Sequence, residues 1–325
     1  MRGFAFVHPL AKRVFHATGG VDGVRWLNRR KLRILMYHRF SDRQALAAQC
    51  VHLRRYYSLV SMDQVADRLQ SGGGLPENAL AVTVDDGYRD FLETAFPVFA
   101  AHGIPVTLYL VTDFVDGKCW LWFDRVSYAF RHSELPQATV TLPSGRTMFL
   151  GLESESSRVE AANVVNDILI GLSDRARLDF LEGLPGLLGV EVPAQPPSEY
   201  RALSWKEVRS LAARSVEFGA HTETHPILSR LASEVELTQE IYGSMRRLEE
   251  ELGKPVAHFC YPNGKERDIG PRVMRTVRAA GLLTAVTAEP GLNHPGCDLW
   301  SLRRIGVDPD MDPLYFRQRV AGFRA

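Results

Sequence analysis

Short apolar runs alternate with amphipathic stretches along most of the chain, which predicts strands separated by helices. The apolar runs have few polar gaps, as is typical of strands buried on both faces of a parallel sheet. They cover residues 32–38, 79–84, 106–111, 216–220, 256–260, 282–287 and 302–307. Predicted helices cover residues 44–57, 62–70, 88–102, 205–213, 233–252, 269–280 and 312–324. We therefore expect an α/β fold, a distorted (β/α) barrel of seven or eight units.

The alternation breaks off between residues 113 and 203. Residues 138–150 alternate between apolar and polar positions around a Pro-Ser-Gly turn, which predicts a β-hairpin outside the main sheet. Two helices are predicted at 153–170 and 173–188, and a proline-rich connector then leads back. We expect this region to be a lid-like α+β insertion within a barrel domain that covers residues 32–325.

Residues 1–31 form a basic N-terminal extension. Counted as far as residue 33, the segment carries eight basic residues and a single acid, Asp22. The basic residues are Arg2, Lys12, Arg13, Arg25, Arg29, Arg30, Lys31 and Arg33. Such a segment either rests on an anionic membrane surface or packs on the barrel as a solvated extension. A peripheral contact with the inner face of the membrane is therefore one of two open expectations.

Composition narrows the class of protein. Hydrophobic residues make up 45% of the chain and charged residues 24%, as in ordinary globular proteins. A net charge of +1 gives no reason to expect a nucleic-acid partner. No run approaches the roughly 20 apolar residues of a membrane-spanning helix. The four cysteines are scattered and the N-terminus makes a poor signal peptide, so we expect a cytoplasmic protein.

Two groups of polar residues follow predicted strands. Asp85 and Asp86 come directly after one apolar run, and His221 and His225 follow another. In a (β/α) barrel the carboxyl ends of the strands meet at one face, where catalytic residues gather. One carboxylate with two histidines is a ligand set typical of a catalytic zinc site with a position free for water. The second carboxylate can then act as a base on that water.

A third segment, Phe-Cys-Tyr-Pro-Asn-Gly at residues 259–264, also follows a predicted strand. Because Pro262 has no N–H, the amide of Tyr261 is the natural donor to a developing oxyanion. Each motif alone also fits an ordinary structure: a helix cap for the aspartates, a surface loop for the histidines, a simple turn for the third. Their combination indicates a metal-dependent hydrolase.

Together the three motifs resemble those of the polysaccharide deacetylases of the NodB-homology group, a carbohydrate-esterase family. Its first motif reads Thr-Phe-Asp-Asp-Gly, and residues 83–87 read Thr-Val-Asp-Asp-Gly. Its second reads His-Ser/Thr-x-x-His-Pro, as residues 221–226 do. Residues 36–39, Met-Tyr-His-Arg, are similar to the Tyr-His start of the family. The similarity covers roughly residues 32–112 and 203–310.

The resemblance implies a role for each matching residue. Asp86, His221 and His225 would bind a divalent metal, usually zinc. Asp85 would be the base that deprotonates metal-bound water, and the Tyr261 amide would hold the oxyanion. The substrate would be an N-acetylated sugar, which releases acetate and keeps a free amine.

Two departures from the family pattern leave roles open. Many members carry an arginine in the third motif that steadies the base; here Arg303 or Arg304 is the candidate substitute. The late Leu-x-His motif that supplies a general acid is also missing, and His294 or His38 is the candidate. Trp122 is a candidate for stacking on a sugar ring, although most aromatic side chains simply pack in cores.

We therefore expect a metal-dependent deacetylase that hydrolyses the N-acetyl group of an amino sugar in a polysaccharide or a glycan precursor. The expected substrate is an N-acetylated glycan or a lipid-linked sugar. One alternative is a non-catalytic glycan-binding or scaffold protein of polysaccharide assembly. Another is an O-acetyl esterase that uses the same site.

Overall fold

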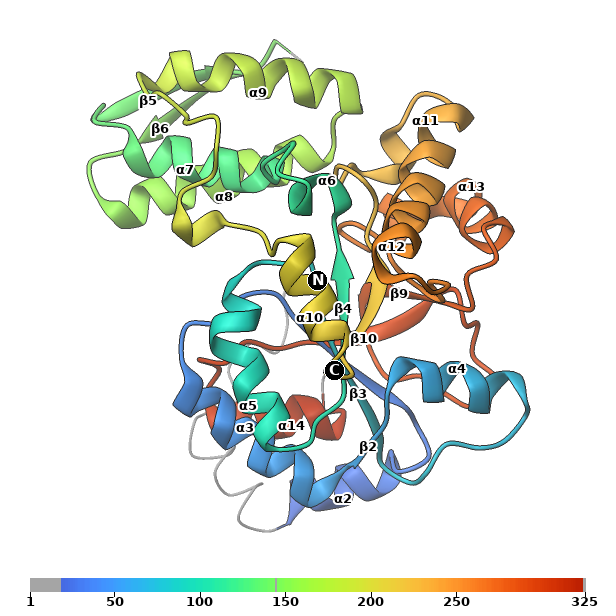
Figure 1. The fold of residues 1–325 in the computed structure, drawn as a ribbon. Helices are drawn as coiled ribbons and strands as arrows, with labels where there is room; N and C mark the ends of the chain where they lie inside the picture. Colours follow the sequence, from blue (N-terminus) through green and yellow to red (C-terminus); the bar gives the residue numbers. More distant parts are fainter. Residues whose placement is uncertain (1–18, 144, 324–325) are drawn as a thin grey trace.

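A closed barrel of parallel strands forms the centre of the molecule (Figure 1). The computed structural model describes residues 19–143 and 145–323. Within these residues seven strands lie side by side in chain order, and the ring closes because β1 pairs with both β10 and β3. They are β1 (Arg33–Tyr37), β3 (Ala79–Val84), β4 (Val106–Leu110), β7 (Glu217–Ala220), β8 (His258–Cys260), β9 (Thr284–Pro290) and β10 (Leu302–Gly306). A short strand, β2 (Ser58–Leu59), pairs with the beginning of β3. The predicted (β/α) barrel is confirmed.

Alternation along each strand decides which side chains fill the barrel. In β3 all six residues are buried. Val82 and Val84 belong to the core cluster shared with the surrounding helices, whereas Ala81 packs with residues of the barrel interior. The same period of two residues carries Thr83 and Asp85 to the inner side. Asp85, the first acid of the Asp85–Asp86 pair, therefore points into the barrel mouth.

Helices cover the outside of the barrel (Figure 1). They are α2 (Gly20–Leu27), α3 (Arg43–Tyr56), α4 (Met62–Gln70), α5 (Phe96–Ala101), α6 (Thr112–Val115), α10 (Trp205–Ala212), α11 (Glu234–Thr238), α12 (Ser244–Leu252), α13 (Glu266–Ala279) and α14 (Pro313–Ala321). Short 3-10 turns lie at η2 (Ser198–Tyr200) and η3 (Leu228–Arg230). Ser204 and Ser233 form capping boxes with the glutamates three positions on, which fixes where α10 and α11 begin.

Two predicted helices contain a π-helical turn. The helix expected at 88–102 starts as η1 (Phe91–Ala95) and continues as α5. Pro97, which has no N–H to donate, stands directly after the π turn, at whose end the amide of Phe96 donates to the carbonyl of Phe91. The helix expected at 233–252 runs from α11 through η4 (Gln239–Gly243) into α12.

The region between β4 and α10 forms a layer of its own beyond the carboxyl ends of the strands (Figure 1). Its elements are α7 (Trp122–His132), β5 (Gln137–Thr141), β6 (Thr147–Gly151), α8 (Glu155–Ile170) and α9 (Asp174–Leu188). The predicted hairpin and the two long helices are present, and residue 144 of the hairpin turn lies outside the described residues. Phe130, Val140, Val165 and Leu184 form part of a hydrophobic core separate from that of the barrel.

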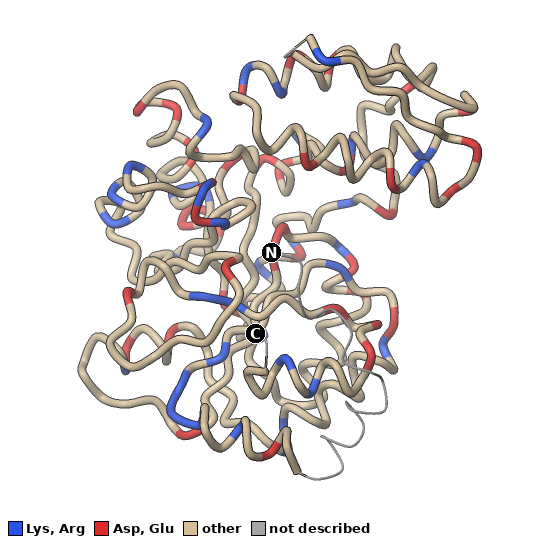
Figure 2. The backbone as a smooth tube through the Cα atoms, turned by 180° about the vertical axis from the view of Figure 1, so that it is seen from behind, with Lys and Arg blue, Asp and Glu red and all other residues tan. Residues whose placement is uncertain are grey.

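Only part of the predicted N-terminal extension is described, since residues 1–18 lie outside the described residues. The part that is described contains α2, which contacts α14. Acidic and basic residues are interspersed over the backbone (Figure 2). Among the described residues, no helix has the length and apolar character needed to cross a membrane.

Candidate active site

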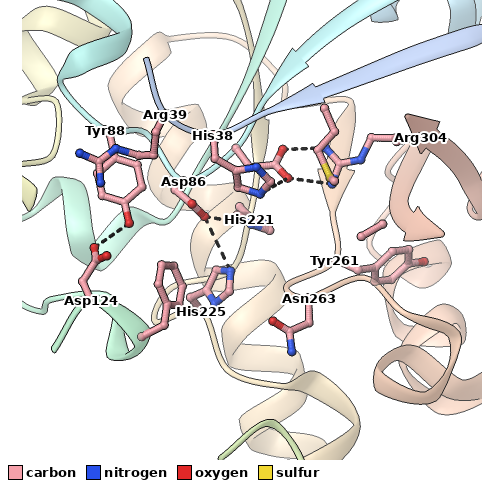
Figure 3. A pocket seen from close by; sticks show the side chains of 14 residues that line it. His38, Arg39, Asp86, Tyr88, Asp124, His221, His225, Tyr261, Asn263 and Arg304 are labelled. Carbon is pink, nitrogen blue, oxygen red and sulfur yellow. Dashed lines mark hydrogen bonds and ion pairs between the residues drawn. The ribbon is translucent and has the colours of Figure 1, made fainter. Parts of the chain in front are cut away.

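The carboxyl ends of the barrel strands surround a cavity of about 440 Å3 (Figure 3). The residues that line it include Asp85 and Asp86, which follow β3, His221 and His225, which follow β7, and Arg304, which lies in β10. All five side chains are buried. Closure of the barrel is what brings them together, since 219 positions separate Asp85 from Arg304 in the chain.

Asp86, His221 and His225 form a cluster suited to a metal ion. Oδ1 of Asp86 lies 3.4 Å from Nε2 of His221 and 3.7 Å from Nε2 of His225. Ligand atoms about 2.0–2.1 Å from a tetrahedral ion are roughly 3.4 Å apart, so small shifts would let all three bind one ion. Two imidazoles and a carboxylate are also the donor set that a divalent metal such as zinc prefers.

The backbone of this cluster is held in an unusual conformation. Asp86, Thr222 and His225 have φ angles of 73°, 70° and 59°. Residues other than glycine rarely adopt this left-handed region, and each such residue costs on the order of 1–3 kcal/mol. The hydroxyl of Thr222 accepts a hydrogen bond from the amide of His225 at 3.1 Å and thereby ties the loop together. Strain of this kind is concentrated at functional sites.

The loop that carries both histidines rests on the π-helical turn η4. Glu240 accepts hydrogen bonds from the backbone N–H groups of Glu223 and Thr224 at 2.9 and 3.0 Å. Gln239 donates to the carboxylate of Glu223 at 2.9 Å. Gly243 permits this close approach, because a Cβ at that position would collide with the same carboxylate. The sequence did not single out Glu240, since it is one of several acids in a predicted helix.

Neighbouring groups orient the imidazole of His221 and hold the backbone of His225. Nδ1 of His221 lies 2.7 Å from the carbonyl oxygen of Cys260, so it donates there and leaves Nε2 for a metal. The indole N–H of Trp122 donates to the carbonyl of His225 at 3.1 Å. Burial lowers the pKa of His225 to about 3, which keeps this imidazole neutral, the form that binds metal. Burial opposes a charge on His221 as well, but Cys260 and Asp86 raise its pKa above the ordinary value. A metal ion would displace that proton.

A buried ion pair fixes the other acid. Nη1 and Nη2 of Arg304 donate to the two carboxylate oxygens of Asp85, each at 2.7 Å. The Nε of Arg304 donates to the carbonyl of Thr287, also at 2.7 Å. Burial alone would raise the pKa of Asp85, but the charge and hydrogen bonds of Arg304 hold it well below its usual range. Of the two candidate arginines, Arg304 is therefore the partner of Asp85. Arg303 is exposed, because neighbouring residues of β10 point to opposite faces.

Two further candidates line the cavity. His38 follows β1, and its Nε2 lies 3.7 Å from Oδ2 of Asp85. Tyr261 lines the cavity too, but its amide N–H donates to the carbonyl of Val286 at 3.2 Å. Its hydroxyl donates to the carbonyl of Trp300. The amide expected to bind an oxyanion thus already has an acceptor.

His294 and Trp122 do not line this cavity, and their roles stay predictions. His294 lines a different pocket together with Leu32, because the adjacent Asn293 pairs with Leu32 just before β1. That position is at the amino end of the strand, opposite the cavity. Trp122 is buried behind the histidine loop, where its indole serves the His225 carbonyl, so it offers no face to a sugar in this cavity.

The structure adds a polar wall that the sequence analysis missed. The hydroxyl of Tyr88 donates to Asp124 at 2.6 Å, and the guanidinium of Arg39 lies 4.0 Å from the centre of the Tyr88 ring (Figure 3). Burial raises the pKa of Asp124 to about 7. Asn263, with a φ of 58°, contributes a side-chain amide to the lining. Asp124 stands in the first turn of α7, an amphipathic helix whose pattern could have been recognised.

Sequence comparison relates the chain to known deacetylases. The family model described as "Polysaccharide deacetylase" matches residues 72–284. A poly-beta-1,6-N-acetyl-D-glucosamine N-deacetylase of Escherichia coli (strain K12) is 37% identical over 73 residues, or 22% of this chain. That match spans only 11% of the length of the relative.

Solved structures share the fold at low sequence identity. The Streptococcus pyogenes deacetylase PplD, in complex with acetate, has a TM-score of 0.58 at 17% identity, with 89% of this chain and 98% of that chain covered. IcaB from Ammonifex degensii has a TM-score of 0.55 at 18% identity, covering 91% and 97%. The BpsB deacetylase domain from Bordetella bronchiseptica has 0.54 at 17%, covering 86% and 96%. At these identities the similarity shows the fold.

We expect the purified chain to bind about one zinc ion, because Asp86, His221 and His225 offer three ligands at one point. Calorimetric titration with zinc and elemental analysis of the dialysed protein measure this. Replacement of His221 and His225 by alanine should abolish binding. His294→Ala is the matched control, since this histidine lies outside the cavity. Wild-type zinc affinity in the double variant would contradict the site.

We expect Arg304→Met to lower the free energy of unfolding by about 3–5 kcal/mol at pH 7, because it leaves the charge of Asp85 buried without a partner. The exposed neighbour supplies the control: Arg303→Met should change stability by less than about 0.5 kcal/mol. Urea denaturation of both variants and the wild type at pH 7 and pH 5 measures these differences.

The pH dependence gives a second readout of the same pair. In the wild type the pKa of Asp85 lies below its unfolded value of about 4, so its contribution is complete at both pH values. In the Arg304→Met variant, burial without a counter-charge raises this pKa above the unfolded value, so acidification relieves the buried charge. The stability difference should therefore shrink from pH 7 to pH 5, and a constant difference would exclude Asp85 as its origin.

Proposed function

Because this chain belongs to the polysaccharide deacetylase family, we propose that it hydrolyses the N-acetyl group of an amino sugar in a polysaccharide or glycan precursor. The observation that carries the proposal is that two adjacent acids in one cavity, Asp85 and Asp86, have different partners. Asp86 lies with two histidines in a metal-binding arrangement, while both carboxylate oxygens of Asp85 accept hydrogen bonds from Arg304. A site that only bound a glycan would have no need of the second acid.

In the proposed reaction, Asp85 would act on the same water that a bound metal would activate. Asp86, His221 and His225 would hold a divalent metal, for which we propose zinc. When bound, the metal would acidify a water molecule and polarise the acetamide carbonyl. Asp85 takes the proton from the attacking water, a role for which it must be ionised. The bidentate contact with Arg304 secures that state and fixes the direction in which the carboxylate points.

We assign the general acid to His38. Besides the two metal-binding histidines, it is the imidazole that lines the cavity among the described residues. Its side chain is 44% exposed, so it can exchange protons with solvent between turnovers. From the end of β1 it faces the same space as Asp85, and imidazole is the commonest side chain for donating a proton to a leaving amine.

The side chains assigned to the oxyanion and to the sugar, Asn263 and Asp124, lie on opposite walls of the cavity (Figure 3). The side chain of Asn263 makes no hydrogen bond to another described residue, so its amide can serve a developing negative charge beside Tyr261. Asp124 has one carboxylate oxygen held by Tyr88 and the other free to accept from a sugar hydroxyl. These assignments place the acetamide between Asp85 and Asn263, with the ring toward Asp124.

The exposed end of α2 supports a contact with an anionic membrane surface. Trp26 and Leu27 are 60% and 70% exposed, although apolar side chains of this size are usually covered. Arg29 lies over the ring of Trp26, and Arg30 and Lys31 follow. Exposed aromatic and aliphatic side chains can insert at the surface of a bilayer, and neighbouring cations are attracted to its anionic headgroups. We propose that this contact brings the protein to a lipid-linked substrate at the cytoplasmic face.

We expect Asp85→Asn to reduce turnover by roughly 10²–10⁴-fold while zinc stays bound, because the variant loses the base and keeps the metal ligands. Acetate release from an N-acetylglucosamine oligomer measures turnover, and calorimetry measures zinc. His294→Ala should behave as the wild type. An active Asp85→Asn variant would exclude this acid as the base.

Parallel assays separate the alternative functions. Acetate release from an O-acetylated sugar but not from the N-acetyl oligomer would identify an esterase. Binding of the oligomer by a zinc-loaded wild type that releases no acetate would support the glycan-binding alternative.

We expect the full chain to bind vesicles that contain phosphatidylglycerol, with weaker binding at high salt and little binding to pure phosphatidylcholine. The double variant Trp26→Ser, Leu27→Ser should bind at least about tenfold more weakly, because it loses the apolar anchor. Phe149→Ser, at an exposed aromatic residue of the insertion, is the control. Vesicle sedimentation measures binding, and undiminished binding of the double variant would exclude α2 as the contact.

A further inference from the structure

A second cavity, also of about 440 Å3, lies where the insertion meets the barrel. Its lining comes from the segment before α7, from α7 and α9, from the connector at 192–194 and from the histidine loop. The two cavities lie back to back. Trp122 and Thr224 line the second cavity, while their chain neighbours Phe123 and His225 line the first.

The cations of this cavity are incompletely paired. Arg177 is buried, 2% exposed, and donates to Asp174 through Nη2, but its Nε and Nη1 have no hydrogen-bond partner in the described part of the chain. The side chain of Arg125 has no hydrogen bond or ion pair to any described residue. Lys118 differs from both, because Asp113 and Asp116 already neutralise it. Unpaired donors of a buried guanidinium are costly, and an oxyanion is the group that satisfies them best.

The rest of the lining is mostly apolar and also includes Asp174 and Thr224. Trp120 and Trp122 are buried, with the guanidinium of Arg177 5.2 Å from the centre of the Trp122 ring, and Leu181, Val192 and Pro193 complete the apolar part of the lining. The indole N–H of Trp120 has no partner among the described residues. An apolar cleft with a few converging donors is typical of a site for a small organic ligand, and aromatic walls suit the apolar face of a sugar ring. The N-terminal end of α9, a helix of 15 residues, adds a favourable field for an anion, although the carboxylate of Asp174 in its first turn also lines the cavity.

We propose that this second cavity binds an anionic sugar unit, with Arg125 and Arg177 contacting a carboxylate or phosphate carried by the ring. The proposal rests on the function proposed for the first cavity, since it makes the substrate an acidic glycan or a glycan phosphate. One helix, α7, would then contact two units of the substrate, through Phe123 and Asp124 on one face and Trp122 and Arg125 on the other.

Calorimetric titration of the zinc-loaded full chain tests the proposal with four probes. These are glucuronic acid, N-acetylglucosamine 6-phosphate, N-acetylglucosamine and inorganic phosphate. We expect at least one of the two acidic sugars to bind about tenfold or more tightly than the neutral sugar and than phosphate. Whichever acidic sugar binds identifies a carboxylate or a phosphate as the source of the charge.

Arg125→Gln should weaken binding of that acidic sugar by about 10–100-fold, the usual range for a charge-assisted hydrogen bond, and leave the neutral sugar unaffected. Arg131→Gln is the matched control on the same helix, because Arg131 is exposed and does not line the cavity. Arg125 is partly exposed, so its replacement should not disturb folding, and thermal denaturation checks this.

Three outcomes would overturn the proposal. They are equal binding of neutral and acidic sugars, phosphate binding as tight as that of the sugar phosphate, and wild-type affinity in Arg125→Gln. These readouts need no turnover. Absence of deacetylation with Arg125-dependent binding would refute the proposed reaction alone, and deacetylation with charge-independent binding would refute this inference alone.

Discussion

The ion pair between Arg304 and Asp85 is the interaction on which the arrangement of the site depends. Removing two charges from water costs several kcal/mol for each ion, and only good geometry with further hydrogen bonds offsets that cost. Here both guanidinium nitrogens meet the carboxylate, and a third contact reaches the carbonyl of Thr287. The pair joins β10 to the end of β3 across the barrel mouth. Because of this pair, Asp85 has a different partner from Asp86. The left-handed backbone of Asp86 directs its side chain toward the histidines.

Much of this arrangement could be predicted from the sequence, because the reactive side chains lie directly after strands. Apolar runs located the strand ends, and Asp85, Asp86, His221 and His225 each stand just beyond one. The partner of Asp85 could not be chosen in this way. Arg303 and Arg304 are adjacent, and only the register of β10 decides which of them faces the interior.

Other features escaped the sequence analysis for a different physical reason. The hydrogen bond of the Tyr261 amide depends on pairing with β9, a contact between distant segments that no local pattern records. Asp124 and Glu240 lie on helices, where an acid is ordinary until tertiary packing buries it. The insertion matters for the same reason. Helix α7 of the insertion forms one wall of the cavity, and its Trp122 donates a hydrogen bond to the carbonyl of His225. The insertion, which lies outside the alternating strands and helices of the barrel, thus helps to complete the site.

Because the π-helical turn η4 supports the histidine loop, the number of residues in its helix affects how the candidate metal ligands are held. A π turn takes up one residue more than an α turn, so the helix from Glu234 to Leu252 changes its angular register partway along. Removing one residue there would restore a regular helix and leave its two halves in nearly the same relative orientation, because the π turn holds the extra residue within one wider turn. Leu248 would stay packed on the barrel, but the wider turn that supplies Gln239, Glu240 and Gly243 to the histidine loop would be lost. In an alignment with any relative, a single-residue gap in this helix would therefore mark a change in how the histidines are held.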